Sequence, residues 1–208
     1  MKNLSVHAII GATLAISLYS AASRACGYHD DVSITRGALN WTYPEALHVI
    51  GAISAATMAK QLAPDESSAP DPFGAQYRVT VKALERFALL FNANSHEAPP
   101  LSFSLVLIEP MLWTHFEAGP NGLSAQAHMS GPRADDLVGV SGQEVIRAIA
   151  NGRLSVGKAH ALGLFRIFGT ERQTAQFSAM VANVGEQRSQ QRESVQARGN
   201  GSSLEVTQ

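Results

Sequence analysis

The sequence is short of cysteine, of net charge and of long apolar runs. One cysteine among 208 residues, Cys26, excludes an intramolecular disulfide framework and a CxxC zinc motif. The 16 Lys and Arg are balanced by 17 Asp and Glu, so the basic field of a nucleic-acid-binding protein is absent. Gly and Pro, 17 and 9 residues, are too few for a collagen-like or low-complexity chain. With 45% apolar and 16% charged residues, the composition fits one modest globular domain or two very small ones.

The N-terminus carries the three parts of a secretory signal peptide. Lys2 precedes an uncharged apolar run from Ala8 to Leu18, and small residues then lead to Ala25. The run is too short to span a bilayer as a mature helix, and a buried first helix is the alternative interpretation. We expect cleavage after Ala25, a mildly acidic mature chain without a transmembrane span, and a periplasmic or secreted location.

Cys26 would then be the first mature residue. Lipoprotein signals usually place Leu three residues before the cysteine, and Ser23 followed by Arg24 argues against a lipid. An intermolecular disulfide, a metal ligand shared with His29 in a C-x-x-H spacing, and a tolerated free thiol all stay open.

Helical signals dominate the chain up to residue 92. Thr42 and Glu45 have the spacing of a capping box, with Pro44 in the first turn, and predict a helix that ends before Pro64. Residues 64–72, rich in Pro, Ser and Asp, indicate an exposed loop. The clearest helical period follows, with apolar residues at steps of three and four: Tyr77, Val81, Leu84, Ala88 and Phe91.

From Leu101 the apolar period changes to that of strands. Residues 101–108, 111–117 and 123–129 are rich in strand formers and are separated by turn residues, and these three closely spaced runs favour an antiparallel meander. A short fourth strand follows over 137–141. A helix over 143–151, a helical turn near 155–162 and a fifth strand over 164–168 come next. Thr170 and Gln173 then form a second capping box, which opens a helix with Phe177, Met180, Val181 and Val184 on one face.

These elements predict an α+β fold in which N-terminal helices precede a five-stranded, mostly antiparallel sheet covered by helices. We expect a signal peptide over 1–25, a single domain over 26–184, and a polar tail over 185–208 whose composition is typical of disorder.

Residues 136–154 (DLVGVSGQEVIRAIANGRL) and 159–169 (AHALGLFRIFG) combine a short helix that ends in Gly, a basic residue and Leu with a second helical turn and a strand closed by Gly. This pattern resembles the sterol-carrier-protein family of hydrophobic-ligand carriers, over about residues 101–183. The resemblance implies a five-stranded sheet covered by helices around an apolar tunnel. Under it, six residues are the expected pocket lining: Phe103, Leu105, Trp113, Phe116, Ile149 and Phe165.

No spacing in the sequence assembles a catalytic or metal site. The histidines show no H-x-x-x-H or H-E-x-x-H pattern. His115 and His128 could meet across neighbouring strands, although each is more typical of a hydrogen-bonded or partly exposed strand residue. Asp135 and Asp136 could form a carboxylate pair, but adjacent acids in a loop usually face water. We therefore expect no catalytic residues, no metal and no cofactor.

The leading hypothesis is an exported, non-enzymatic protein that binds a lipid-like or other apolar molecule. The alternative is an envelope accessory or assembly protein that binds a partner protein or a metal centre through the Cys26–His29 region. A hydrolase with a site built from distant residues is a third, weaker hypothesis.

Overall fold

A computed structural model describes residues 33–63, 74–92, 101–120 and 122–182. The predicted signal peptide, Cys26, His29, the loop over 64–72 and the polar tail lie outside these residues. The predictions made for them therefore stay predictions.

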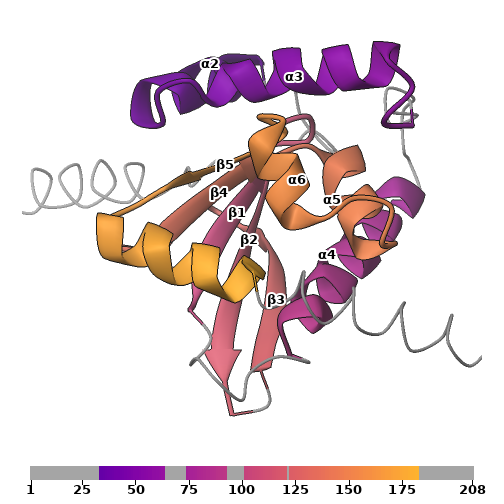
Figure 1. Cartoon of the computed structure of the whole chain (residues 1–208). Coiled ribbons are helices and arrows are strands. Elements are labelled where there is room, and N and C mark those ends of the chain that lie inside the picture. Colours follow the sequence, from indigo (N-terminus) through magenta and orange to yellow (C-terminus); the bar gives the residue numbers. More distant parts are fainter. Residues whose placement is uncertain (1–32, 64–73, 93–100, 121, 183–208) are drawn as a thin grey trace, which may run out of the picture.

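The fold is α+β, with N-terminal helices followed by a five-stranded mixed sheet (Figure 1). Helices α2 (Ser33–Thr42), α3 (Ala46–Met58) and α4 (Ala75–Asn92) precede the first strand. The strands are β1 (Phe103–Leu107), β2 (Leu112–Gly119), β3 (Gly122–Met129), β4 (Leu137–Ser141) and β5 (Phe165–Phe168). Helices α5 (Gln143–Ala150) and α6 (Val156–Ala161) separate β4 from β5, and a last helix spans 171–182.

The sheet has the order β3-β2-β1-β4-β5. The first three strands form the predicted antiparallel meander, and β5 is antiparallel to β4. The mostly antiparallel sheet is confirmed, and its one parallel pair joins β4 to β1 on the side that β2 leaves open. The β2–β3 hairpin occupies the other side of β1, so the connection after β3 must pass β2 and β1 before β4 joins the sheet, and β5 forms the edge.

Helices cover both faces of the sheet, which explains why β1 and β4 are buried along their whole length. The main core fills the face under α4, α5, α6 and the last helix, and its centre is a group of fully buried side chains: Leu84, Phe87, Phe103, Leu105, Phe116, Ile149 and Phe165. The predicted apolar period of α4 is confirmed, since Leu84, Ala88 and Phe91 are buried against this core.

The second core lies on the opposite face, where α2 and α3 lie along the sheet (Figure 1). Val106, Ile108, Val138 and Val140 point from the sheet into it, and Tyr43 packs at the α2–α3 junction. The Tyr43 ring contacts Trp113 at 6.2 Å and Phe168 at 5.3 Å between ring centroids. This aromatic contact holds the junction of the two helices on the sheet.

The start of the N-terminal layer differs from the prediction. An additional helix, α2, ends at Thr42, so this residue is not an N-cap. Glu45 occupies that position with a φ of 70°, and its side chain makes no cap hydrogen bond within the described part of the chain. The Glu45 carboxylate instead accepts a hydrogen bond from Arg166 of β5 at 2.7 Å. A tertiary contact has replaced the local capping box.

Candidate functional site

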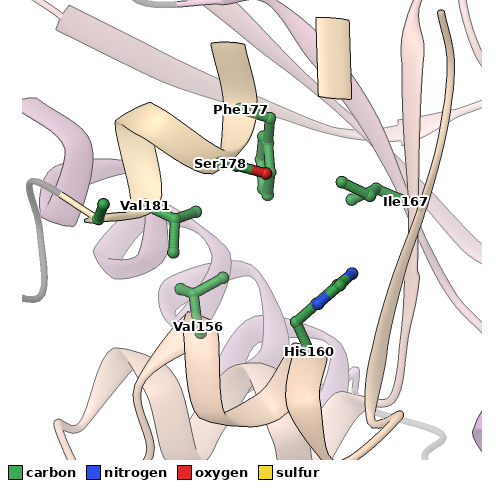
Figure 2. A pocket seen from close by; sticks show the side chains of 8 residues that line it. Val156, His160, Ile167, Phe177, Ser178 and Val181 are labelled. Carbon is green, nitrogen blue, oxygen red and sulfur yellow. The ribbon is translucent and has the colours of Figure 1, made fainter. Parts of the chain in front are cut away.

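An apolar pocket of about 240 Å³ lies between α6, β5 and the last helix (Figure 2). Its lining consists of Val156, Gly157, His160, Ile167, Phe177, Ser178, Val181 and Ala182. The three elements each contribute side chains that face a common space, and the imidazole of His160 points into it from α6 (Figure 2). The pocket is therefore apolar on most sides, with one titratable side chain among its walls.

Local capping signals determine where the two helical walls begin. The Ser155 hydroxyl accepts a hydrogen bond from Lys158 N at 3.1 Å and starts α6. The predicted capping box at Thr170 is confirmed, with Thr170 N donating to Gln173 Oε1 at 2.8 Å and Gln173 N donating to Thr170 Oγ1 at 3.3 Å. Along the chain α6 precedes β5 and the last helix follows it, and the pocket is lined by all three.

Phe177 connects the pocket to the aromatic core. Its ring stacks on Phe165 at 5.9 Å with an interplanar angle of 8°, and meets the edge of Phe103 at 5.3 Å. Only 3% of Phe177 is exposed, so the ring is held from behind by other aromatic rings. A molecule in the pocket would touch Phe177 directly.

The six residues predicted to line a pocket do not line this one. Five of them are fully buried in the main core: Phe103, Leu105, Phe116, Ile149 and Phe165. Phe103 and Phe165 lie directly behind Phe177, one layer away from the open space. Trp113 lies on the opposite face of the sheet, where it packs beside Tyr43. As the lining of a ligand tunnel, the six residues stay a prediction.

A second feature, which we call the polar cluster, consists of Ser104, His115, Asp136, Glu117 and Arg133 on the face of the sheet opposite the pocket. Ser104 and His115 are register partners on β1 and β2 and are each 1% exposed. The Ser104 hydroxyl donates to Asp136 Oδ2 at 2.5 Å, and His115 Nδ1 lies 2.9 Å from the same oxygen. Asp136 thus joins two buried side chains of the sheet to the start of β4.

These are the residue types of a serine-hydrolase triad, but their arrangement differs from it. In a triad the hydroxyl faces Nε2 of the histidine and the carboxylate faces Nδ1. Here both the hydroxyl and Nδ1 face one carboxylate oxygen, and Ser104 Oγ lies 3.4 Å from Nδ1. The Ser104 hydroxyl donates to the Asp136 carboxylate rather than to the His115 imidazole. The geometry supports a structural role for this hydroxyl.

The other side of the His115 ring faces Glu117. His115 Nε2 is buried, makes no hydrogen bond within the described residues, and lies 3.5 Å from Glu117 Oε2. Arg133 pairs with the same carboxylate at 2.5 Å and donates to Gln126 at 3.2 Å. The hydrogen bond from Arg133 is the main reason why the pKa of Glu117 lies below its ordinary value. The β3–β4 connection is thus attached to the sheet at two points, through Arg133 and Asp136.

The sequence pointed to two members of the polar cluster, His115 and Asp136, but no pattern linked them. His115 is the hydrogen-bonded strand residue that the sequence favoured, and it pairs across the sheet with Gln126 rather than with His128. His128 has a φ of 66° next to a register shift and packs against Tyr77. The expectation that Asp136 faces water is wrong, since only 11% of its side chain is exposed. Asp136 directly precedes the strand predicted to begin at 137, and this position was the available sequence signal that its side chain lies against the sheet.

Within the residues that the structure describes, no group of three or more His, Cys, Asp and Glu side chains could hold a metal ion. In the same residues no helix is long and apolar enough to cross a membrane. Cys26 and His29 lie outside them, so a metal or partner site there stays a prediction.

Comparisons with protein-family models, with curated proteins and with solved structures found no match to this chain. The resemblance to sterol carrier proteins therefore stays a prediction, and the function is argued from the pocket alone.

Proposed function

We propose that this protein binds a compact apolar molecule, or the apolar end of a lipid, in the pocket between α6, β5 and the last helix. The observation that carries this proposal is an open space of about 240 Å³ walled by Val156, Ile167, Phe177 and Val181. Burial of apolar surface contributes about 25 cal/mol per Å², so binding requires no catalytic group. We accordingly propose a non-enzymatic role.

The size of the pocket favours a small ligand or a short stretch of a longer one. A dry apolar cavity of about 150 Å³ is enough to hold benzene, and this pocket is larger. His160 is the ionisable side chain in the wall, and Ser178 is the hydroxyl. Because the Ser178 hydroxyl donates to Thr174 O at 2.8 Å, its proton is already used within the last helix. A polar end of the ligand would therefore meet the His160 imidazole first.

Export to the periplasm or cell exterior is the second part of the proposal, and it rests on the N-terminal sequence alone. Native mass spectrometry of the protein purified from its own host tests both parts. We expect a mass that corresponds to cleavage after Ala25 and a non-covalent apolar adduct of several hundred daltons. A bare chain would count against a retained ligand, and a metal-sized increase would favour the Cys26–His29 alternative.

A steric variant tests whether the pocket is the site. Gly157 lines the pocket in α6, and a Cβ there would meet no described atom within 4 Å. Gly157→Leu should therefore fold, since Leu is a better helix former than Gly, while its side chain occupies part of the open space. We expect the affinity for N-phenyl-1-naphthylamine, an uncharged apolar fluorescent probe, to fall about tenfold, which corresponds to about 1.4 kcal/mol.

The matched control is Gly37→Leu in α2. Gly37 is also helical and exposed, and a Cβ there also meets no described atom within 4 Å. This variant should bind the probe as the unmodified protein does. Equal binding by Gly157→Leu and Gly37→Leu would place any apolar site somewhere other than this pocket.

A further inference from the structure

Helix α3 is apolar on its outer side as well as on its inner side. Its 13 residues include no Asp, Glu, Lys or Arg. The inner side places Ala46, Val49 and Ala56 against the sheet. On the outer side Leu47 is 38%, Ile50 37% and Met58 77% exposed. A helix with only water beyond it normally presents charged residues there, so this composition indicates a covered surface.

The middle of that outer side is made of small residues. Gly51, Ser54 and Ala55 are exposed and lie between Ile50 and Met58 at helical spacing. A Cβ on Gly51 would meet no described atom within 4 Å, and its φ is not in the left-handed region. Neither packing nor backbone conformation within the described residues requires glycine there, although glycine costs about 1 kcal/mol in a helix relative to alanine. The chain thus leaves room on α3 for another backbone.

Opposite charges stand at the two ends of this surface. Glu45 immediately precedes α3 and half of its side chain is exposed, while Lys60 follows the helix and is exposed. The helical rise from Glu45 to Lys60 is about 22 Å. Two copies of α3 in parallel would bring like charges together, whereas antiparallel copies bring Glu45 of each copy opposite Lys60 of the other.

We propose that α3 pairs antiparallel with α3 of a second copy of this chain, across a two-fold axis near residues 52 and 53. This register places Leu47 opposite Met58, Ile50 opposite Ala55 and Gly51 opposite Ser54 of the second copy. Large residues then face smaller or flexible ones, as a self-complementary two-fold interface requires. The helix dipoles also run in opposite directions. Trp41, near the end of α2, is a further exposed apolar side chain of the N-terminal helices, with 91% of it exposed.

The charge pattern favours a second copy over two other occupants. A nucleic acid or an anionic membrane would need several Lys or Arg side chains along the surface, and α3 has neither residue. The proposal is independent of the apolar pocket, because α6, β5 and the last helix form that site. Probe binding and self-association are therefore separate measurements.

Sedimentation velocity of the purified protein, with the N-terminus that its host leaves on it, tests the dimer. We expect a dimer at micromolar concentration and a loss of association by at least about tenfold in Ile50→Lys. Leu89→Lys is the matched control, since Leu89 is a 60% exposed apolar residue on α4. A monomer at about 100 µM, or equal effects of the two variants, would overturn the proposal.

A charge exchange tests the antiparallel register. Glu45→Lys and Lys60→Glu should each weaken self-association, because each creates two like-charged contacts across the two-fold axis. Mixing the two variants should restore dimers. In the mixed dimer one copy carries lysine at both positions and the other carries glutamate at both, so both contacts again join opposite charges.

The contact between Glu45 and Arg166 is exposed on both sides, so its loss should leave Glu45→Lys folded. Lys60 is exposed after the end of α3, so Lys60→Glu should fold as well. A mixture that stays as weak as its components would overturn the antiparallel register.

Discussion

At the level of single residues, Asp136 joins the buried partners of the polar cluster. One oxygen of its carboxylate faces both the Ser104 hydroxyl and His115 Nδ1, and both partners are 1% exposed. A buried donor that loses its acceptor costs the free energy of its desolvation, about 1–3 kcal/mol. The cluster therefore stabilises the β3–β4 connection through a few short contacts.

Asp136→Ala should lower the free energy of unfolding by about 2–4 kcal/mol, because two buried donors lose one acceptor. Urea denaturation measures this change. Asp135→Ala is the neighbouring comparison, although its φ of 61° adds the cost of a non-glycine residue in the left-handed region. Asp135→Asn avoids that cost, since Asn tolerates this conformation, and should change stability by less than about 0.5 kcal/mol. Equal effects of Asp136→Ala and Asp135→Asn would contradict the role of the buried carboxylate.

Glu117 gives the cluster a pH dependence of defined sign. The hydrogen bond from Arg133 lowers the pKa of Glu117 below its ordinary value of 4.5. A lowered folded-state pKa means that the ion pair stabilises the fold above pH 4.5, and that this stabilisation is lost as pH falls through the lowered pKa. Glu117→Gln should therefore be less stable than the unmodified protein at pH 7, and the two stabilities should converge at low pH.

Urea unfolding between pH 2.5 and pH 7 measures this convergence. Arg133→Gln removes the other member of the pair. In a protein that carries Arg133→Gln, adding Glu117→Gln should no longer produce this pH-dependent difference in stability. A difference between the unmodified protein and Glu117→Gln that stays constant over this range would refute the assignment to the Glu117 carboxylate.

At the level of elements, the capping box at Thr170 determines where the last helix begins. That helix supplies Phe177, Ser178, Val181 and Ala182, four of the eight lining residues of the pocket, so its first turn positions half of the lining. The reciprocal bonds between Thr170 and Gln173 satisfy two backbone donors at its start.

Thr170→Ala should lower the free energy of unfolding by about 1 kcal/mol, since it removes an N-cap acceptor. Hydrogen exchange should accelerate most over residues 171–175. Thr174→Ala is the matched control, because the Thr174 hydroxyl bonds back to carbonyl oxygens inside the helix and caps nothing. Similar exchange in both variants would show that the box does not set the helix start.

At the level of the whole molecule, the sheet separates two apolar cores. The pocket belongs to the main core, whereas Tyr43, Trp113 and Phe168 belong to the layer under α2 and α3. The central strands are buried on both sides, so each face packs against its own helices. A change on one face should alter the stability of the domain without reshaping the other face.

Trp113→Ala tests this separation. We expect a loss of about 2 kcal/mol in stability, because the ring contact with Tyr43 at the α2–α3 junction disappears. Binding of N-phenyl-1-naphthylamine should stay within about twofold of the unmodified protein, in contrast to Gly157→Leu. A tenfold weaker probe affinity in Trp113→Ala would instead restore Trp113 as a ligand contact.

Local patterns in the sequence were sufficient for most elements and for the fold class. These patterns extend over only a few neighbouring positions, so they can be recognised without tertiary information. Examples are the periodic apolar residues from Tyr77 to Phe91, the capping box at Thr170 and the turn residues between strands. The six residues that the family resemblance implied for a pocket lining are aromatic and aliphatic, and five of them belong to the centre of the main core. Apolar periodicity reports burial, and it does not distinguish a close-packed side chain from one beside an open space.

Contacts between distant segments decided the rest. The parallel pairing of β4 with β1, the position of Glu45 against Arg166, and the junction of Ser104, His115 and Asp136 each join residues more than ten positions apart. The pocket likewise depends on the distance at which α6 and the last helix flank β5. The sequence by itself determined which segments are helices and strands, because those preferences are local. Only the tertiary structure decided which side chains meet and where space is left between them, because both depend on the packing of the whole chain.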